Sequence, residues 1–107
     1  MIKGIGVDIA LIKRFFSKDG KFVQKILSEI EFSQYTKLSD LRKVEYLAGR
    51  FCAKEAYYKA KKNRDLGYHD IEILDDKKLG VIISDPKAHL SISHDGEYVI
   101  AFVIIEE

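Results

Sequence analysis

Residues 98–105 read YVIAFVII, and this run of eight apolar residues constrains the fold more than any other feature. A strand with one face in water alternates between apolar and polar side chains, whereas this segment is apolar on both faces. Both faces must therefore be covered. One long helix covers one face of a sheet, and a chain of 107 residues has little left for the other. A tightly wrapped monomer would satisfy the pattern, but an oligomer whose other subunits cover the second face satisfies it more simply.

Patterning elsewhere predicts a single α+β domain over residues 1–107, with a mostly antiparallel sheet packed on one long helix plus short N-terminal helices. The long helix is expected to be capped by Ser39 or Asp40 and to end near Asn63. Short helices are expected within 10–30, and strands over 2–9, 70–74, 81–83, 88–93 and 98–105. Asp95-Gly96 is a strong hairpin signal before the last strand.

Composition excludes several classes of protein. The chain is 47% hydrophobic and 33% charged with a net charge of +1, unlike a disordered chain or a general polycation. No segment approaches the about 20 apolar residues of a membrane span, and Asp8, Lys13 and Arg14 interrupt the N-terminal segment, so no signal peptide is expected. The single cysteine, Cys52, allows no intramolecular disulfide and fits a reducing compartment such as the cytoplasm. It is expected in the core and not as a nucleophile.

One acid falls where a helix should be apolar. In helical projection, Glu55 lies near the centre of an apolar face and Lys59 follows one turn later. The members of this face are Leu41, Val44, Ala48, Phe51 and Cys52. An exposed Glu55–Lys59 pair would explain the acid, although such a pair contributes only about 0.3–0.5 kcal/mol.

Asp8 suggests a second explanation. It lies on the first strand, whose apolar face carries Ile5, Val7 and Ile9, and on the side of the small residues Gly4 and Gly6. Two half-buried carboxylates repel each other unless a cation joins them, and two carboxylates with water and phosphate oxygens are usual ligands of Mg²⁺. The residues thus leave two possibilities, a simple ion pair or a metal–phosphate site in which Lys59 binds phosphate.

Three segments together resemble the holo-acyl-carrier-protein synthases, which are small phosphopantetheinyl transferases. They are GIGVDIALIKRF, RFCAKEAYYKA and SISHDGEYVIAFVI, and their order and spacing match over nearly the whole chain. The resemblance implies the 4′-phosphopantetheinyl transferase fold. It also implies transfer of 4′-phosphopantetheine from coenzyme A to a serine of an apo carrier protein, with release of adenosine 3′,5′-bisphosphate. The family is a homotrimer with active sites between subunits, which would cover the apolar strand.

The resemblance also implies roles for individual residues. Asp8 and Glu55 would hold Mg²⁺ on the pyrophosphate of coenzyme A, and Lys59 would neutralise charge on the phosphates. The base that takes the serine proton would be Glu55 or a water molecule held beside it by the metal. A catalytically inactive coenzyme A-binding module is the alternative to an enzyme, and the intact Asp8, Glu55 and Lys59 count against it.

Arg50, Ser93 and His94 are implied as coenzyme A ligands. Arg50 projects from the side of its helix opposite Glu55, so Arg50 and His94 would serve the coenzyme A of a neighbouring subunit. Without the resemblance, His94 would be a turn histidine in water. The family usually carries a short helix before SISH, and here the shorter SDPKA replaces it.

A basic stretch follows the first strand. Its five cations, set against the single acid Asp19, are Lys13, Arg14, Lys18, Lys21 and Lys25. Carrier proteins are acidic on the helix after their serine, so this stretch suits a docking surface for an acyl carrier protein. A solvated basic face is the plain alternative, and a nucleic-acid site is disfavoured by the near-neutral net charge.

Overall fold

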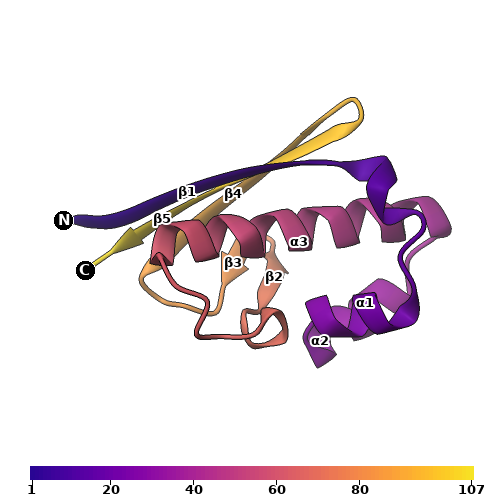
Figure 1. Ribbon diagram of the computed structural model, residues 1–107, viewed down its shortest axis with the longest axis horizontal. Coiled ribbons are helices and arrows are strands. Elements are labelled where there is room, and N and C mark those ends of the chain that lie inside the picture. Colours follow the sequence, from indigo (N-terminus) through magenta and orange to yellow (C-terminus); the bar gives the residue numbers. More distant parts are fainter.

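Helix α3, Asp40–Lys61, is the axis on which the other elements pack in the computed structural model, which describes residues 1–107 (Figure 1). The side chain of Ser39 caps it by accepting a hydrogen bond from the backbone N–H of Arg42. It ends at Lys62, which adopts a left-handed conformation with φ 66° and donates its backbone N–H to the carbonyl of Tyr58. The prediction of a long helix that begins at Ser39 or Asp40 is confirmed.

A three-stranded antiparallel sheet lies along one side of α3 (Figure 1). Its order is β1-β5-β4, with β1 at Ile2–Leu11, β5 at Tyr98–Glu106 and β4 at Ala88–Asp95. The apolar run thus forms the central strand, where both edges are paired. Gly96, with φ 59°, forms the turn between β4 and β5, so the hairpin prediction is confirmed.

The strands β2, Ile73–Asp76, and β3, Gly80–Ile83, form a separate two-stranded hairpin on the other side of α3 (Figure 1). The prediction of a strand over residues 70–74 was therefore wrong in position. The segment Tyr68–Asp70 is instead a short 3-10 helix, η2. The carboxylate of Asp70 accepts the backbone N–H of Gly67 and closes a local turn, which competes with strand pairing.

Two short helices, α1 at Gly20–Ile26 and α2 at Glu29–Thr36, lie on the side of α3 away from the three-stranded sheet (Figure 1). A short 3-10 helix, η1 at Ile12–Phe15, directly follows β1. Asp19 caps α1, and Ser28 and Glu31 form a reciprocal capping box on α2. No helix of the protein combines the length and apolar character needed to cross a bilayer.

Strand β1 packs unusually close to α3. A Cβ atom on Gly4 would collide with the carbonyl oxygen of Ala60, and one on Gly6 would collide with that of Ala56. Only glycine permits this approach, because the obstacle in each case is rigid helix backbone. The small residues of β1 therefore face the helix, and the large ones face outward.

The outward face of the sheet is apolar and uncovered in the single chain. Ile5, Val7 and Ile9 of β1 are 58%, 48% and 60% exposed, and Ile100 and Phe102 of β5 lie beside them, also exposed. We call these five residues the outer sheet face. The tightly wrapped monomer was therefore the wrong alternative, since only one face of β5 is covered by the chain itself. The oligomer stays a prediction.

A buried ion pair, which was not predicted, lies on the opposite side of α3. Lys54 and Glu31 have no exposed side-chain surface, and their charged atoms are 2.6 Å apart. The Lys54 ammonium also donates to the carbonyls of Ile26 and Tyr68, at 2.7 and 3.0 Å. The second carboxylate oxygen of Glu31 accepts the N–H of Ile73. The pair thereby joins α1, α2, α3 and β2.

Candidate active site

Asp8 lies on β1 directly over the second half of α3. Its carbonyl oxygen accepts a hydrogen bond from the Cys52 thiol at 3.1 Å, and its carboxylate accepts one from the Lys59 ammonium at 3.0 Å. The same ammonium donates to the carbonyl of Val7 at 3.1 Å. Asp8 thus sits above the helical turn between Cys52 and Lys59, which is the turn that carries Glu55.

Glu55 does not occupy the centre of the buried helix face, as helical projection suggested. The centre is formed by Cys52 and Ala56, while the Glu55 side chain remains 17% exposed at the margin. Leu41, expected on the same apolar face, is 62% exposed. The projection failed because α3 is covered on two sides, by the sheet and by the short helices, so its buried surface is wider than one stripe.

Three hydrogen bonds hold the Glu55 carboxylate. The two terminal nitrogens of Arg64 donate to its two oxygens at 3.1 and 3.0 Å, and the Tyr68 hydroxyl donates to Oε2 at 2.6 Å. The expected Glu55–Lys59 pair is not formed, because Lys59 pairs with Asp8 instead. The simple ion-pair explanation of Glu55 was therefore wrong in its partner. Sequence reasoning missed both Arg64 and Tyr68.

The electrostatics keep Glu55 ionised. Partial burial raises the pKa of its carboxyl group, but the hydrogen bonds from Arg64 and Tyr68 and the charges of Arg64 and Lys59 outweigh burial and lower the pKa overall. Lys59 is thus paired with Asp8 and also close enough to stabilise the charge of Glu55. Two half-buried carboxylates share the neighbourhood of one ammonium group.

This pair of acids fits a magnesium ion. Mg²⁺ binds oxygen ligands, usually one or two carboxylates, and completes its octahedron with water and substrate phosphate oxygens. The protein offers two carboxylates and no group of three or more metal-ligating side chains. The cations that now neutralise Asp8 and Glu55 are Lys59 and Arg64, whose side chains are 53% and 57% exposed. A divalent ion can replace such exposed partners at small cost.

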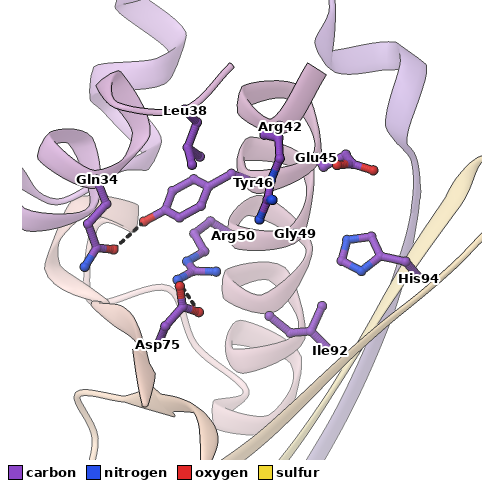
Figure 2. Close-up of a pocket in the computed structure, with 10 residues that line it drawn as sticks. All are labelled: Gln34, Leu38, Arg42, Glu45, Tyr46, Gly49, Arg50, Asp75, Ile92 and His94. Atoms are coloured by element: carbon purple, nitrogen blue, oxygen red, sulfur yellow. Dashed lines mark hydrogen bonds and ion pairs between the residues drawn. The ribbon is translucent and has the colours of Figure 1, made fainter. Parts of the chain in front are cut away.

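A second cluster lies around Arg50, on another side of α3. The Arg50 guanidinium stacks 4.2 Å from the ring centre of Tyr46, and it donates to the carbonyl of Ile73 at 3.2 Å and to Asp75 at 3.4 Å. Figure 2 shows that Arg50 and His94 line the same pocket, whose volume is about 710 Å³. Its other lining residues are Gln34, Leu38, Arg42, Glu45, Tyr46, Gly49, Asp75 and Ile92.

The structure brings Arg50 and His94 together, as expected, but it separates Ser93 from both. Ser93 pairs with Ile100 and shares its outward side of the sheet, because neighbouring residues of a strand point to opposite faces. Arg50 and Glu55 lie roughly 140° apart around α3, at about 100° per residue. The chain therefore presents two separated half-sites, one with Asp8, Glu55 and Lys59 and one with Arg50 and His94.

Arg42 is a second arginine of the pocket, and sequence reasoning missed it. It lies two helical turns before Arg50, and Tyr46 lies between them at the same spacing (Figure 2). This spacing of four residues was a signal that could have found it, since such positions share one face of a helix.

The five basic residues expected to bind a partner are all exposed. Lys13 and Arg14 lie on η1, Lys21 and Lys25 on α1, and Lys18 between the two helices. We call this set the basic N-terminal surface. Phe16, 61% exposed, lies within it, so the surface combines positive charge with an apolar contact.

Cys52 belongs to the core, as predicted. It has no exposed surface, and burial, followed by the neighbouring Asp8, raises the pKa of its thiol to about 12. The thiol stays protonated at neutral pH and is no nucleophile.

Comparison with known proteins shows the family to which the chain belongs. Residues 4–103 match the family model of the 4′-phosphopantetheinyl transferase superfamily. The holo-[acyl-carrier-protein] synthase of a Geobacillus species is 46% identical over 116 aligned positions, which cover 99% of this chain and 98% of that protein. That of Bacillus subtilis is 44% identical and covers 99% and 97%. Both alignments are longer than this chain, so these relatives carry residues that it lacks.

The fold agrees as well. A crystal structure of a holo-(acyl-carrier-protein) synthase from Bacillus anthracis, in complex with CoA (3′,5′-ADP), matches with a TM-score of 0.90 and 38% identity. The match covers 98% of this chain and 96% of that one. The expected α+β fold is thereby confirmed. On these grounds, the chain belongs to the 4′-phosphopantetheinyl transferase superfamily and, within it, to the holo-[acyl-carrier-protein] synthases.

Proposed function

We propose that this protein transfers the 4′-phosphopantetheine group of coenzyme A to a serine of an apo-acyl carrier protein. The reaction depends on Mg²⁺ and releases adenosine 3′,5′-bisphosphate. The names of its relatives and the coenzyme A complex of one of them support the reaction class. The observation that carries the proposal is the placement of Asp8 over the α3 turn that bears Glu55 and Lys59, since the three residues supply two metal ligands and a phosphate-binding cation.

Each residue of this half-site has a task in the transfer. Asp8 and Glu55 hold Mg²⁺, which when bound stabilises negative charge on the pyrophosphate. Lys59 leaves Asp8 and binds a phosphate oxygen, where its ammonium neutralises charge that develops in the transition state. The serine oxygen forms a bond to phosphorus, and the bond from phosphorus to the bisphosphate leaving group breaks. The serine proton passes to Glu55 or to a water molecule beside it.

The pocket with Arg50 and His94 binds phosphate groups at the nucleotide end of coenzyme A, and Arg42 adds a second guanidinium charge. Because this pocket and Glu55 lie on different sides of α3, we assign the two half-sites of one active site to neighbouring subunits of a homotrimer. The uncovered outer sheet face supports this assembly, since burial of its apolar side chains would drive association. Ser93, on the same side of the sheet, would act with a neighbouring subunit.

The basic N-terminal surface docks the acidic helix of the carrier protein. Its positive charge raises the rate of encounter and orients the partner, while Phe16 adds apolar contact. We place the reaction in the cytoplasm, a reducing compartment that suits a chain whose one cysteine is free and buried.

Intact-mass spectrometry tests the proposed function. An apo-acyl carrier protein, incubated with the protein, coenzyme A and Mg²⁺, should gain the mass of phosphopantetheine, and EDTA should abolish the gain. The variant Glu55→Gln keeps the shape of the side chain and removes a charge, so it should fold and lose transfer by about a hundredfold or more. Retention of full activity would show that Glu55 is no metal ligand. No gain with the unchanged protein, together with intact coenzyme A binding, would favour the inactive binding module.

A further inference from the structure

The guanidinium of Arg64 occupies the very oxygens of Glu55 that a metal ion requires. Its two terminal nitrogens engage Oε1 and Oε2 separately, in the bidentate geometry that suits a carboxylate. The Tyr68 hydroxyl takes a further position on Oε2. A magnesium ion at Glu55 would therefore meet a positive charge already in place at both oxygens.

Arg64 is held in a way that permits its release. It lies beyond the end of α3 with a side chain 57% exposed. Besides its ion pair with Glu55, the guanidinium donates a hydrogen bond to the Tyr68 hydroxyl at 3.3 Å and lies over the ring of Tyr58 at 4.5 Å. Its departure from Glu55 would bury no charge and would break no backbone hydrogen bond.

Tyr68, in contrast, is fixed in place. Its ring stacks on that of Phe51 with 5.8 Å between ring centres and packs edge-on against that of Tyr58 with 5.2 Å between ring centres. Its backbone carbonyl accepts a hydrogen bond from the buried ammonium group of Lys54. The hydroxyl is a neutral donor, so it can remain bonded to Glu55 when a metal ion approaches another lone pair of the carboxylate. Tyr68 keeps the orientation of Glu55 constant while the cation beside it changes.

Arg64 also lines a small cleft next to Lys59 and Lys62. Its volume is about 230 Å³, and its lining residues are Tyr58, Lys59, Lys62, Asn63 and Arg64. Three of these five carry positive charge, so an anionic phosphate group in the cleft would stabilise Arg64 away from Glu55.

We propose that Arg64 is an internal counter-ion that competes with Mg²⁺ for Glu55, and that Tyr68 holds the carboxylate in its metal-binding orientation throughout. The proposal rests on the assignment of Asp8 and Glu55 as metal ligands in the proposed function. It makes Arg64 a residue that sets the affinity for the metal before coenzyme A binds.

Binding of Mn²⁺ without coenzyme A or carrier protein tests this. Mn²⁺ shares the preference of Mg²⁺ for oxygen ligands, and its free concentration can be measured by electron paramagnetic resonance. We expect Arg64→Gln to tighten Mn²⁺ binding by about three- to tenfold, because the ion no longer displaces a bidentate cation. Arg64→Lys, which keeps the charge but loses the fork, should lie between it and the unchanged protein. Tyr68→Phe should weaken binding.

Lys62→Asn is the matched control. It removes one positive charge from the same cleft without a contact to Glu55, and asparagine tolerates the left-handed backbone at this position. Its effect on Mn²⁺ affinity should stay below about twofold, since exposed charges are screened. An equal gain for Lys62→Asn and Arg64→Gln would overturn the proposal, because general electrostatics would then explain both. Unchanged or weaker binding by Arg64→Gln would also overturn it.

A further variant separates this proposal from the proposed function. Glu55→Gln should weaken Mn²⁺ binding strongly. If it does so while Arg64→Gln has no effect, the metal site stands and only the competition is refuted. If Glu55→Gln leaves Mn²⁺ affinity unchanged, the metal assignment itself fails, and the role of Arg64 fails with it.

Discussion

Lys54 carries an ammonium group into the core with no exposed surface, and Glu31 is the partner that makes its burial tolerable. Desolvation lowers the pKa of Lys54, whereas the charge and hydrogen bond of Glu31 act to raise it. Removing one member of such a pair leaves an uncompensated buried charge, which is far more costly than losing an exposed pair. Glu55, the next residue along α3, belongs to a different environment: its side chain is 17% exposed, and its partner Arg64 is itself largely exposed and can leave.

We expect Lys54→Ala to lower the free energy of unfolding by about 3–5 kcal/mol, measured by urea denaturation, because the buried Glu31 carboxylate would lose its closest cation and keep only Arg50, 3.9 Å away. Lys25→Ala removes the same charge from an exposed position on α1 and should change stability by no more than about 0.5 kcal/mol. A loss for Lys54→Ala no larger than that of this control would mean that Glu31 does not need its partner.

At the scale of elements, the site depends on how closely β1 lies against α3. Gly4 and Gly6 bring the strand onto the helix backbone, and this approach lets Asp8 reach the turn that carries Glu55. The two acids come from segments far apart in the chain. Their proximity is therefore set by the strand–helix distance and not by any local motif.

Gly6→Ala should disturb both stability and function. The new methyl group would collide with the carbonyl oxygen of Ala56, and overpacking of this kind costs about 1–3 kcal/mol or more. The strand would move outward and carry Asp8 away from Glu55, so transfer activity should fall beyond what the unfolded fraction explains. Thermal melting and the mass-spectrometric assay, run below the melting temperature, measure the two effects.

Gly20→Ala is the matched control for that substitution. Nothing lies within 4 Å of the added methyl group, and Gly20 begins a helix, where alanine is the better residue. Stability should stay equal or rise, with activity unchanged. If Gly6→Ala behaves like Gly20→Ala, the close approach of β1 is not what positions Asp8.

Elements with local signals could be predicted from the sequence. The Ser39 cap and the Asp95-Gly96 turn each act within a few residues, and both are where expected. The strand over 70–74 could not be placed, because the side-chain turn at Asp70 overrides an alternating pattern. The separate β2–β3 hairpin was missed because alternation specifies a strand and not its neighbour.

The candidate site was predictable only in part, for a similar reason. Asp8 and Glu55 stood out because acids interrupt apolar patterns, and the family motifs reinforced them. Arg64 and Tyr68 follow the end of α3, and the left-handed turn at Lys62 is what returns them to Glu55. No periodicity relates residues across such a turn.

At the scale of the whole molecule, two features of the single chain support the proposed homotrimer. Its outer sheet face exposes apolar side chains from two strands, and its two half-sites lie on different sides of α3. The proposed homotrimer would resolve both, because a neighbour that covers the sheet face would also bring its own Arg50 pocket toward Glu55. A heterologous contact of this kind closes into a ring when the rotation between subunits allows it.

Phe102→Glu should convert the assembly to monomers, measured by size-exclusion chromatography with light scattering. The residue is 43% exposed in the single chain, so the substitution should leave the monomer folded while placing a charge in the contact. Leu41→Glu makes the same kind of change at an exposed apolar residue of α3, away from the sheet, and should remain assembled. If Phe102→Glu keeps the mass of the unchanged protein, the outer sheet face is not the interface.

Mixing two inactive variants tests whether each active site draws on two subunits, with transfer activity as the measurement. An Arg50→Ala chain keeps Glu55, and a Glu55→Gln chain keeps Arg50, so neither can build a complete site alone if each site draws on two subunits. After joint refolding, roughly one quarter of the interfaces should pair an intact Glu55 with an intact Arg50, and transfer activity should return in proportion. Adding Phe102→Glu to both chains should abolish the recovery. If the mixture stays inactive while mixed assemblies form, Glu55 and Arg50 must both be intact in the same subunit. Arg50, which lies on a different side of α3, would then bind a ligand other than the coenzyme A molecule at Glu55.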